Sequence, residues 1–418
     1  MPFTPSWVAS ANDPETDFPL ANLPYGVFSP SGAAPRCGVA IGDAILDVAA
    51  AEAAELIALP GGPLLAAPAW NGPMAAGPDV WTMLRERLTE LLRDGAPERE
   101  RVGAHLHPRA TATMRMPFVV AEFTDFYAGR HHATNVGTMF RGPENALPPN
   151  WLSMPIGYNG RASSVVVSGT AVRRPWGQLK APSDALPRLA PSARFDFELE
   201  LGAVVGTPSS VPVTVAEADA MVFGYVLLND WSARDIQAWE YQPLGPFVSK
   251  ATATSISPWI VPRAALEPFR VPAPRRERPL PPYLDEPGPM LHDIELAVDL
   301  AVDGAASVTV ARTNARELYY SGAQQIAHHS VSGCPMRTGD LIGSGTISGA
   351  GRHERGSLLE LSWGGEEPID LGGGRTRAFL EDGDTLTLRG HAPGDGYRIG
   401  FGRCTGTVLP ALADPYAR

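Results

Sequence analysis

The chain has 418 residues, with 34 Lys and Arg against 45 Asp and Glu, and a formal net charge of −11 at pH 7. This length predicts two or three domains, and 44% hydrophobic against 19% charged residues excludes a disordered chain. The acidic balance argues against nucleic acid as a partner. Lys180 and Lys250 are the only lysines, and three cysteines, Cys37, Cys334 and Cys404, exclude a disulfide scaffold and a zinc cluster.

The sequence contains no pattern typical of a secretion signal or a membrane span. Its first residues are acidic and interrupted by prolines, whereas a signal peptide is first basic and then apolar. The longest uncharged stretch, residues 56–78, contains five prolines and cannot form a membrane helix. We therefore expect a cytoplasmic protein without a membrane partner.

The first part of the chain predicts a small β domain followed by a helix. Residues 23–28 and 36–43 are short apolar runs separated by turn residues, which is typical of strands. Apolar residues then recur at helical spacing after Asp79, the expected N-cap, and the run ends before Gly95. The recurring positions are Val80, Leu84, Leu88, Leu91 and Leu92.

The rest of the chain predicts a second, larger domain that consists mostly of strands. A connector that ends near Met116 would divide the chain into domains of residues 1–116 and 117–418. Within the second domain, residues 271–289 are rich in proline and arginine, which predicts an exposed loop.

Apolar and acidic residues alternate strictly over residues 195–201, so Asp196, Glu198 and Glu200 would share one face of a strand. A solvated strand face is the more common reason for such a pattern. Two carboxylates separated by one residue repel each other, however, unless a cation lies between them. The pattern therefore leaves both a solvated face and a cation site open.

A second group of polar residues follows residues 221–228, an apolar run that predicts a buried strand. If a helix follows, an acid, a cation, an amide and a phenol lie on one of its faces. These residues are Asp230, Arg234, Gln237 and Tyr241. Such a placement at the end of a strand is often functional, but a solvated helix face with an Asp–Arg pair explains the spacing equally well.

A third group lies in residues 123–135, where an acid, an arginine and the pair His131 and His132 are surrounded by aromatic residues. The segment is too aromatic for a solvated loop. A histidine pair is a weak signal by itself. His328 and His329 form another pair, for which the sequence indicates no role.

These three segments, together with residues 155–164, 343–349 and 395–402, resemble the fumarylacetoacetase family along nearly the whole chain. The resemblance implies a mainly β (α+β) fold with a small N-terminal SH3-like β barrel, a large C-terminal β-sandwich roll and assembly into a homodimer. It also implies an enzyme that hydrolyses a carbon–carbon bond of a diketo acid, 4-fumarylacetoacetate, to fumarate and acetoacetate. This reaction is the last step of tyrosine and phenylalanine catabolism.

The resemblance implies a divalent metal bound by carboxylates. The family's ligand positions fall on Asp125, Glu198, Glu200 and Asp230, and Asp196 is not among them. Oxygen ligands without nitrogen or sulfur suit a hard ion, Mg²⁺, Ca²⁺ or Mn²⁺. Lys250 and Thr254 match positions that bind a second Mg²⁺. An ammonium group cannot ligate a metal, so we attribute this match to the backbone carbonyl of Lys250, with its side chain free for an anion.

Catalytic roles also follow from the resemblance. The base falls on His132 and the acid that orients it on Glu360, although His131 is adjacent and the choice between the two histidines rests on alignment. An imidazole held by a carboxylate can take a proton from water. Attack on a carbonyl and expulsion of an enolate both create negative charge, for which the family's donors are Arg234, Gln237 and Lys250. One of the only two lysines thus falls at a catalytic position.

The family's substrate-binding positions are Tyr127, Arg141, Tyr158, Gln237, Tyr241 and Thr346. The planar fork of Arg141 suits a carboxylate of the substrate. Two other readings remain. A decarboxylase or isomerase on the same scaffold would use the four acids without a water-activating His–Glu pair. A non-catalytic metal-binding or interaction protein would have these polar residues scattered over its structure.

Overall fold

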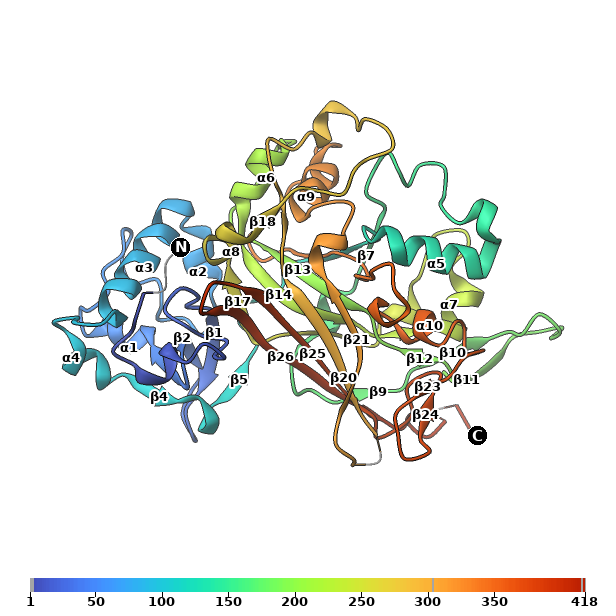
Figure 1. The fold of residues 1–418 in the computed structure, drawn as a ribbon, viewed down its shortest axis with the longest axis horizontal. Coiled ribbons are helices and arrows are strands. Elements are labelled where there is room, and N and C mark those ends of the chain that lie inside the picture. Colours follow the sequence, from blue (N-terminus) through green and yellow to red (C-terminus); the bar gives the residue numbers. More distant parts are fainter. Residues whose placement is uncertain (1–3, 303, 415, 418) are drawn as a thin grey trace.

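The computed structural model describes residues 4–302, 304–414, 416 and 417. Two large β-sheets form the centre of the molecule, and most helices are short and lie around them (Figure 1). The prediction of a mainly β (α+β) fold is therefore confirmed.

The larger sheet has 13 strands and includes strands from both predicted domains. Its main path is β4 (Leu106–Pro108), β3 (Ala44–Asp47), β2 (Arg36–Ile41), β1 (Tyr25–Ser29), β17 (Trp259–Pro262), β14 (Val222–Asp230), β13 (Leu199–Val205), β22 (Leu341–Gly343), β6 (Phe123–Phe126) and β7 (Gly157–Asn159). Beside this path lie β5 (Thr113–Arg115), which pairs with β1, and β16 (Thr254–Ile256), which pairs with β14 and with β8 (Val165–Val167). Every residue of β13 and β14 is buried, as their apolar composition predicts for strands covered on both faces.

The second sheet has five strands and lies against the first. Its order is β21 (Val308–Asn314), β20 (Glu295–Ala301), β25 (Thr385–Pro393), β26 (Arg398–Leu409) and β9 (Val172–Arg173). Four two-stranded sheets account for the remaining strands of the described residues: β10 (Trp176–Leu179) with β11 (Arg188–Pro191), β12 (Phe195–Asp196) with β15 (Ser232–Ala233), β18 (Arg270–Val271) with β19 (Leu291–His292), and β23 (Ile369–Asp370) with β24 (Thr376–Arg377).

The α-helices of the described residues are α1 (Val48–Ala53), α2 (Asn71–Ala75), α3 (Pro78–Leu92), α4 (Arg99–Gly103), α5 (Arg130–Arg141), α6 (Val215–Met221), α7 (Arg234–Glu240), α8 (Arg263–Leu266), α9 (Gly322–Ser330) and α10 (Leu358–Leu361). Of these, α5, α7 and α10 lie at the end of the molecule away from the N-terminal region (Figure 1). None of the helices within the described ranges is both long and apolar enough to cross a membrane.

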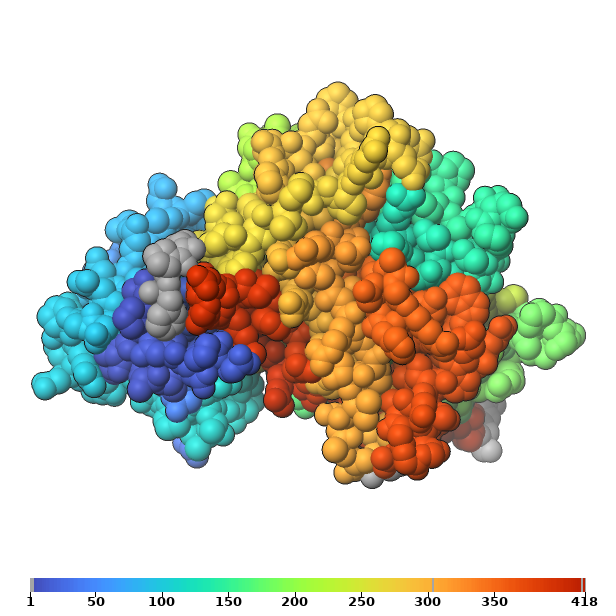
Figure 2. All heavy atoms as spheres, in the orientation of Figure 1, coloured from blue at the N-terminus to red at the C-terminus, as the bar shows by residue number. Residues whose placement is uncertain are grey.

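The N-terminal region is joined to the rest of the molecule through the larger sheet and through its core. Tyr25 of β1 pairs with Ile260 of β17, and its ring stacks on Trp70 at 4.4 Å and on Phe223 at 5.0 Å. Residues close to the start of β26 also lie against this region (Figure 2). Arg398, the first residue of β26, forms an ion pair with Asp17 there. The strands described here show no barrel closure, so the SH3-like barrel and the boundary after residue 116 stay predictions.

Helix α3 confirms the predicted apolar stripe but starts before the predicted N-cap. All five of the predicted apolar positions are buried. The helix begins at Pro78, after Gly77, so Asp79 lies inside the first turn and the prediction of Asp79 as N-cap is wrong. Proline is well suited to the first helical position, because its missing N–H would have no helical acceptor there. Asp79 still interacts favourably with the positive end of the helix.

Residues 195–201 do not form the single strand that their alternation predicts, so this prediction is wrong. Strand β12 ends at Asp196 and pairs with β15, whereas β13 starts at Leu199 and pairs with β14. The alternative of a solvated strand face is also wrong, because Asp196, Glu198 and Glu200 are all buried. The chain changes its pairing partner within this segment, and Asp196 therefore lies apart from the other two acids.

The segment 271–289 is exposed only in part. Leu284 is fully buried, and the guanidinium of Arg276 lies 4.8 Å from the ring centre of Tyr319. Glu277 forms an ion pair with Arg130 at the start of α5. The segment is therefore packed against the body of the molecule, which its proline and arginine content did not indicate.

Candidate active site

The site is built around His132, a buried residue near the start of α5. Helix α5 follows Gly129, where a Cβ atom would collide with the carbonyl oxygen of Thr346, so glycine allows this close approach. Nδ1 of His132 lies 2.6 Å from Oε2 of Glu360, and Nε2 lies 3.8 Å from Oε1 of Glu198. The imidazole is thus held on one side by a carboxylate and faces the acidic cluster on the other.

Glu360 is fixed by hydrogen bonds to both carboxylate oxygens. Asn135, on α5, donates to Oε1 at 2.8 Å, and Ser357 and Ser348 donate to Oε2 at 2.8 and 3.0 Å. Burial opposes ionisation of Glu360, but His132 and these donors hold its pKa below the usual value. An ionised Glu360 accepts a hydrogen bond from the Nδ1–H group of His132, so Nε2 is the unprotonated nitrogen of the neutral ring and can accept a proton.

Four carboxylates converge beside His132 because they lie on, or next to, three strands that are close together in the larger sheet. Their ligand atoms lie within 4.8 Å of one another. The residues are Asp125 on β6, Glu198 just before β13, Glu200 on β13 and Asp230 at the end of β14. Strand β22 lies between β13 and β6, and a Cβ atom at its Gly343 would collide with Oδ1 of Asp125. The missing side chain therefore leaves room for the cluster.

The protein alone does not neutralise this cluster. Burial, followed by the charge of Asp230, raises the pKa of Asp125 to about 8, and burial with the charge of Asp125 raises the pKa of Glu200 well above its usual range. Oδ1 of Asp125 and Oε1 of Glu200 are buried without a hydrogen-bond partner. An all-oxygen donor set with unpartnered carboxylate oxygens fits a hard divalent cation. The residues present could therefore hold one.

Two cations contact the cluster. Nη1 of Arg234, at the start of α7, lies 2.7 Å from Oε1 of Glu198, and Nζ of Lys250 donates to both Glu198 and Asp230. Burial opposes ionisation of Glu198, but Lys250 and then Arg234 lower its pKa. The ammonium of Lys250 is therefore engaged by carboxylates here, and the expectation of a free side chain is wrong. Thr254 lies at the edge of the cluster, with Oγ1 3.5 Å from Oδ1 of Asp230.

The predicted helix from Asp230 to Tyr241 is wrong in extent. Asp230 is the last residue of β14, and α7 starts only at Arg234. Arg234 pairs with Asp196 and Glu198 rather than in an i, i+4 pair with Asp230. Within α7 the predicted shared face of Arg234 and Gln237 is confirmed, because Nη1 of Arg234 donates to Oε1 of Gln237 at 3.1 Å.

A cavity of about 370 Å³, the active-site cavity, opens onto His132 and the acidic cluster. All six of the predicted substrate-binding residues line it: Tyr127, Arg141, Tyr158, Gln237, Tyr241 and Thr346. The hydroxyl of Tyr158 lies 3.0 Å from Asp125 and 2.9 Å from Asp230. Arg141 donates to the carbonyl oxygens of Asn145 and Ala146 at 3.1 and 2.7 Å. The polar residues are thus gathered in one place rather than scattered.

The other histidines lie outside this cavity. His131 is half-exposed, with Nε2 3.4 Å from Oε2 of Glu317. Nε2 of His329 lies 2.9 Å from the hydroxyl of Thr124, and Nδ1 of His328 lies 2.8 Å from the hydroxyl of Tyr283. Of the adjacent pair near the start of α5, only His132 faces the acidic cluster.

Several residues of the site had no role in the sequence-based predictions. Asn135 lies three positions after His132 and hence on the same helix face, and Ser357 precedes Glu360 in a Ser-x-x-Glu N-cap pattern, so both could have been found locally. Ser348 carries no such signal. The apolar wall of the cavity is formed by Phe126, Val136, Phe140, Ile156 and Leu359, among others.

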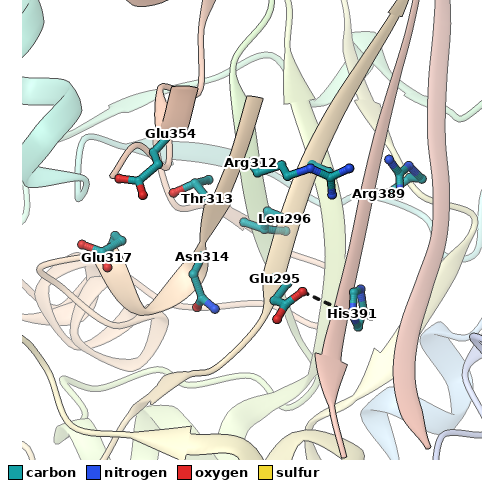
Figure 3. A pocket seen from close by; sticks show the side chains of 10 residues that line it. Glu295, Leu296, Arg312, Thr313, Asn314, Glu317, Glu354, Arg389 and His391 are labelled. Carbon is teal, nitrogen blue, oxygen red and sulfur yellow. Dashed lines mark ion pairs between the residues drawn. The ribbon is translucent and has the colours of Figure 1, made fainter. Parts of the chain in front are cut away.

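A second cavity, of about 280 Å³, lies beside β20, β21 and β25 and is named the sheet cavity (Figure 3). Its charged lining residues are Glu295, Arg312, Glu317, Glu354, Arg389 and His391. Nε2 of His391 lies 3.5 Å from Oε2 of Glu295, its neighbour across the strand pair (Figure 3). No residue of the sheet cavity was predicted to be functional.

A β-rich scaffold that gathers a His–Glu pair and four buried carboxylates around one cavity is typical of an enzyme whose carboxylates could hold a divalent cation. Comparison with family models identifies the family to which the chain belongs. The fumarylacetoacetate hydrolase C-terminal model matches residues 122–409, and the fumarylacetoacetase N-terminal model matches residues 21–117. The chain belongs to the fumarylacetoacetate hydrolase family, as the sequence resemblance predicted.

The chain is similar to complete proteins of this family. It is 48% identical to the fumarylacetoacetase of Rattus norvegicus (98% of this chain, 99% of that protein), 49% identical to that of Homo sapiens (97% and 99%) and 46% identical to that of Arabidopsis thaliana (95% and 97%). Its fold is similar to the solved structure of a fumarylacetoacetate hydrolase from Exiguobacterium antarcticum, with a TM-score of 0.53, 16% identity and coverage of 93% of this chain and 99% of the other.

Proposed function

We propose that the chain is a hydrolase that cleaves the carbon–carbon bond between the two carbonyl groups of 4-fumarylacetoacetate, releasing fumarate and acetoacetate in the last step of tyrosine and phenylalanine catabolism. The observation that carries this proposal is the His132–Glu360 pair facing four buried carboxylates in one cavity. Relatives named fumarylacetoacetase, nearly half identical over almost their full length, support the same reaction.

The first step is attack by water, with His132 as the base. Nε2 of His132 accepts a proton while the water oxygen bonds to the carbonyl carbon next to the double bond, the carbon that becomes the new carboxyl of fumarate. Glu360 accepts a hydrogen bond from the Nδ1–H group throughout without taking its proton, and its negative charge stabilises the imidazolium. A base positioned in this way contributes about 10²–10⁴ in rate.

In the second step the tetrahedral intermediate collapses to the carboxyl group of fumarate, and the electron pair of the broken carbon–carbon bond goes to the enolate of acetoacetate. The enolate carbon then takes the proton that Nε2 of His132 had accepted from water, which regenerates the base. Arg234, Gln237 and Lys250 line the cavity and are the donors that would stabilise the oxyanion and the enolate. Arg234 is suited to this task because its Nη2 is buried without a protein partner. Each such donor is worth about 10²–10³ in rate.

Asp125, Glu198, Glu200 and Asp230 would hold one divalent cation, for which Mg²⁺, Ca²⁺ and Mn²⁺ are the candidates. When bound, it would polarise the two carbonyl oxygens of the diketone as a Lewis acid. The carbonyl of Lys250 and Thr254 would hold a second Mg²⁺, a proposal that rests on the family's pattern.

Binding of the substrate is assigned to Tyr127, Arg141, Tyr158, Gln237, Tyr241 and Thr346, which line the cavity. The planar fork of Arg141 suits a terminal carboxylate of the substrate. To bind it, Arg141 would exchange its hydrogen bonds to the carbonyl oxygens of Asn145 and Ala146 for hydrogen bonds to the carboxylate. Burial, with the charge of Asp230, raises the pKa of Tyr158 well above its usual value, so its hydroxyl stays a donor. We also propose that the chain is a cytoplasmic homodimer, as the family resemblance implies.

The test is to follow the loss of diketone absorbance when the purified protein and Mg²⁺ are mixed with fumarylacetoacetate. The proposal expects turnover by the wild type and by His131→Ala, and a loss of about 10²–10⁴ in kcat for His132→Ala. Activity of His132→Ala equal to that of the wild type would contradict a water-activating base and favour decarboxylation or isomerisation on the same scaffold.

A further inference from the structure

Asp196 is a buried carboxylate that lies near the active-site cavity and is not a member of the metal-binding cluster. Four donors surround it. Oδ1 accepts from the backbone N–H groups of Phe197 and Leu358, both at 2.8 Å. Oδ2 accepts from Nε of Arg234 at 2.8 Å and from the backbone N–H of Leu359 at 3.0 Å. Each oxygen thus accepts two hydrogen bonds, and all four partners of the carboxylate are donors.

The bond from Asp196 holds the Arg234 side chain at a different nitrogen from the one that contacts the acidic cluster. Nε is bound by Asp196, and Nη1 reaches Glu198 at 2.7 Å and Gln237 at 3.1 Å. Nη2 is left without a protein partner although it is buried. Because a guanidinium is planar, fixing Nε and Nη1 also fixes the direction of the Nη2 donor.

The bonds to Leu358 and Leu359 hold the segment that carries Glu360. These two residues are the first of α10, and their N–H groups have no acceptor within the helix. Glu360 is the next residue, and its carboxylate bonds Nδ1 of His132 at 2.6 Å. A carboxylate at this helix start is also favoured by the helix dipole.

We infer that Asp196 is a positioning residue that fixes the donor Arg234 and the His132–Glu360 pair relative to each other through one carboxylate. This role rests on the proposed function of the site. Asparagine cannot replace it, because its NH₂ group would face donors and one carbonyl oxygen cannot accept all four hydrogen bonds. A misplacement of about 1 Å at a reacting centre costs about 10² in rate.

The experiment compares Asp196→Asn with Asp384→Asn. Asp384 is a matched control because it is buried and pairs with Arg377 at 2.9 and 3.0 Å, and none of its hydrogen bonds reaches the active-site cavity. We expect Asp196→Asn to lower kcat about 10²-fold with little change in KM. Asp384→Asn should lower the melting temperature but keep the kcat of the wild type.

Two further measurements separate positioning from a merely structural effect. In ¹H NMR, the His132 Nδ1 proton, identified by its absence in His132→Gln, should shift or disappear in Asp196→Asn and stay in Asp384→Asn. In kinetics, Arg234→Ala should lower kcat by a much smaller factor in the Asp196→Asn background than in the wild type.

An unchanged Nδ1 proton signal in Asp196→Asn would overturn the inference, and so would a full effect of Arg234→Ala in that background. A wild type that does not hydrolyse fumarylacetoacetate would instead refute the proposed function. In that case the NMR comparison still decides the role of Asp196, since it requires no substrate.

Discussion

The active-site cavity and the sheet cavity are lined by the same kinds of side chains, yet their surroundings differ. In the sheet cavity Glu295 pairs with His391 (Figure 3), and their side chains are 59% and 32% exposed. Arg389, which also lines this cavity, pairs with Asp299. In the active-site cavity the side chains of Glu198 and His132 are only 7% and 4% exposed. In the sheet cavity, residues of opposite charge form pairs in which at least one partner is in contact with water, whereas in the active-site cavity carboxylates are gathered in excess and out of water.

The difference shows that a concentration of charged residues does not by itself indicate a site. Exposed ion pairs are nearly neutral in energy, because water solvates each partner almost as well. Buried like charges are costly unless a ligand or metal compensates them. The unpartnered oxygens of Asp125 and Glu200 carry that cost, which marks the active-site cavity as the one built for a ligand.

The largest effect is expected for Glu198→Gln. This change removes one of the four clustered carboxylates and the partner of both Arg234 and Lys250, so we expect kcat to fall at least about 10³-fold. Mg²⁺ binding, measured by calorimetry, should weaken as well. Glu295→Gln is the matched change in the sheet cavity and should leave both quantities unaltered. Equal losses for the two variants would refute the distinction between the cavities.

A smaller effect is expected for the arginines. Arg234→Lys keeps the charge but loses the planar fork that spans Asp196, Glu198 and Gln237, so kcat should fall about 10²–10³-fold. Arg389→Lys, in the sheet cavity, should alter neither kcat nor KM. Steady-state kinetics of both variants check this, and full activity of Arg234→Lys would show that charge alone is needed at that position.

The smallest effect concerns stability at acidic pH. Burial, and then the charges of Arg270 and Arg263, lower the pKa of His292 from 6.5 to about 3. Below pH 6.5, His292 binds a proton in the unfolded chain but stays neutral in the folded protein. The free energy of unfolding therefore decreases as the pH falls from 6.5 towards 3, by about 1.4 kcal/mol per pH unit.

His292→Gln should therefore flatten the decline of unfolding free energy between pH 6 and 4, measured by denaturant titration, roughly as the single-site linkage predicts. His391 in the sheet cavity is half-buried. Burial lowers its pKa as well, but by less than for His292, because the charge of Glu295 opposes the effect of burial. His391→Gln should therefore change the decline of unfolding free energy at acidic pH, the acid limb of the stability curve, less than His292→Gln does. Parallel acid limbs for the wild type and His292→Gln would show that another group controls acid stability.

Local pattern predicted the parts of the site that depend on neighbours in the sequence. The apolar run of residues 221–228 correctly predicted the buried strand that ends at Asp230. Within the dense polar segment of residues 123–135, Asp125 and His132 line the cavity. The helical spacing from Asp230 onwards was misleading, because the strand continues to Asp230 before α7 begins. Pattern alone could not place that boundary, since pairing with β16 extends the strand.

Long-range contacts account for what the residues alone did not indicate. Glu360 lies 228 positions from His132, and only the family resemblance brought the two together before the structure did. The alternation over residues 195–201 could not reveal that β12 and β13 have different partners, because pairing depends on distant strands. For the same reason, the role of Asp196 became visible only in its contacts with Arg234 and α10.

The central claim is that the active-site cavity activates water for carbon–carbon bond cleavage, and its most direct test is turnover of fumarylacetoacetate in H₂¹⁸O with mass analysis of the products. The proposed reaction places one ¹⁸O atom in the new carboxyl group of fumarate and releases one acetoacetate per fumarate. Release of CO₂, or an isomerised product without ¹⁸O in a carboxyl group, would contradict it.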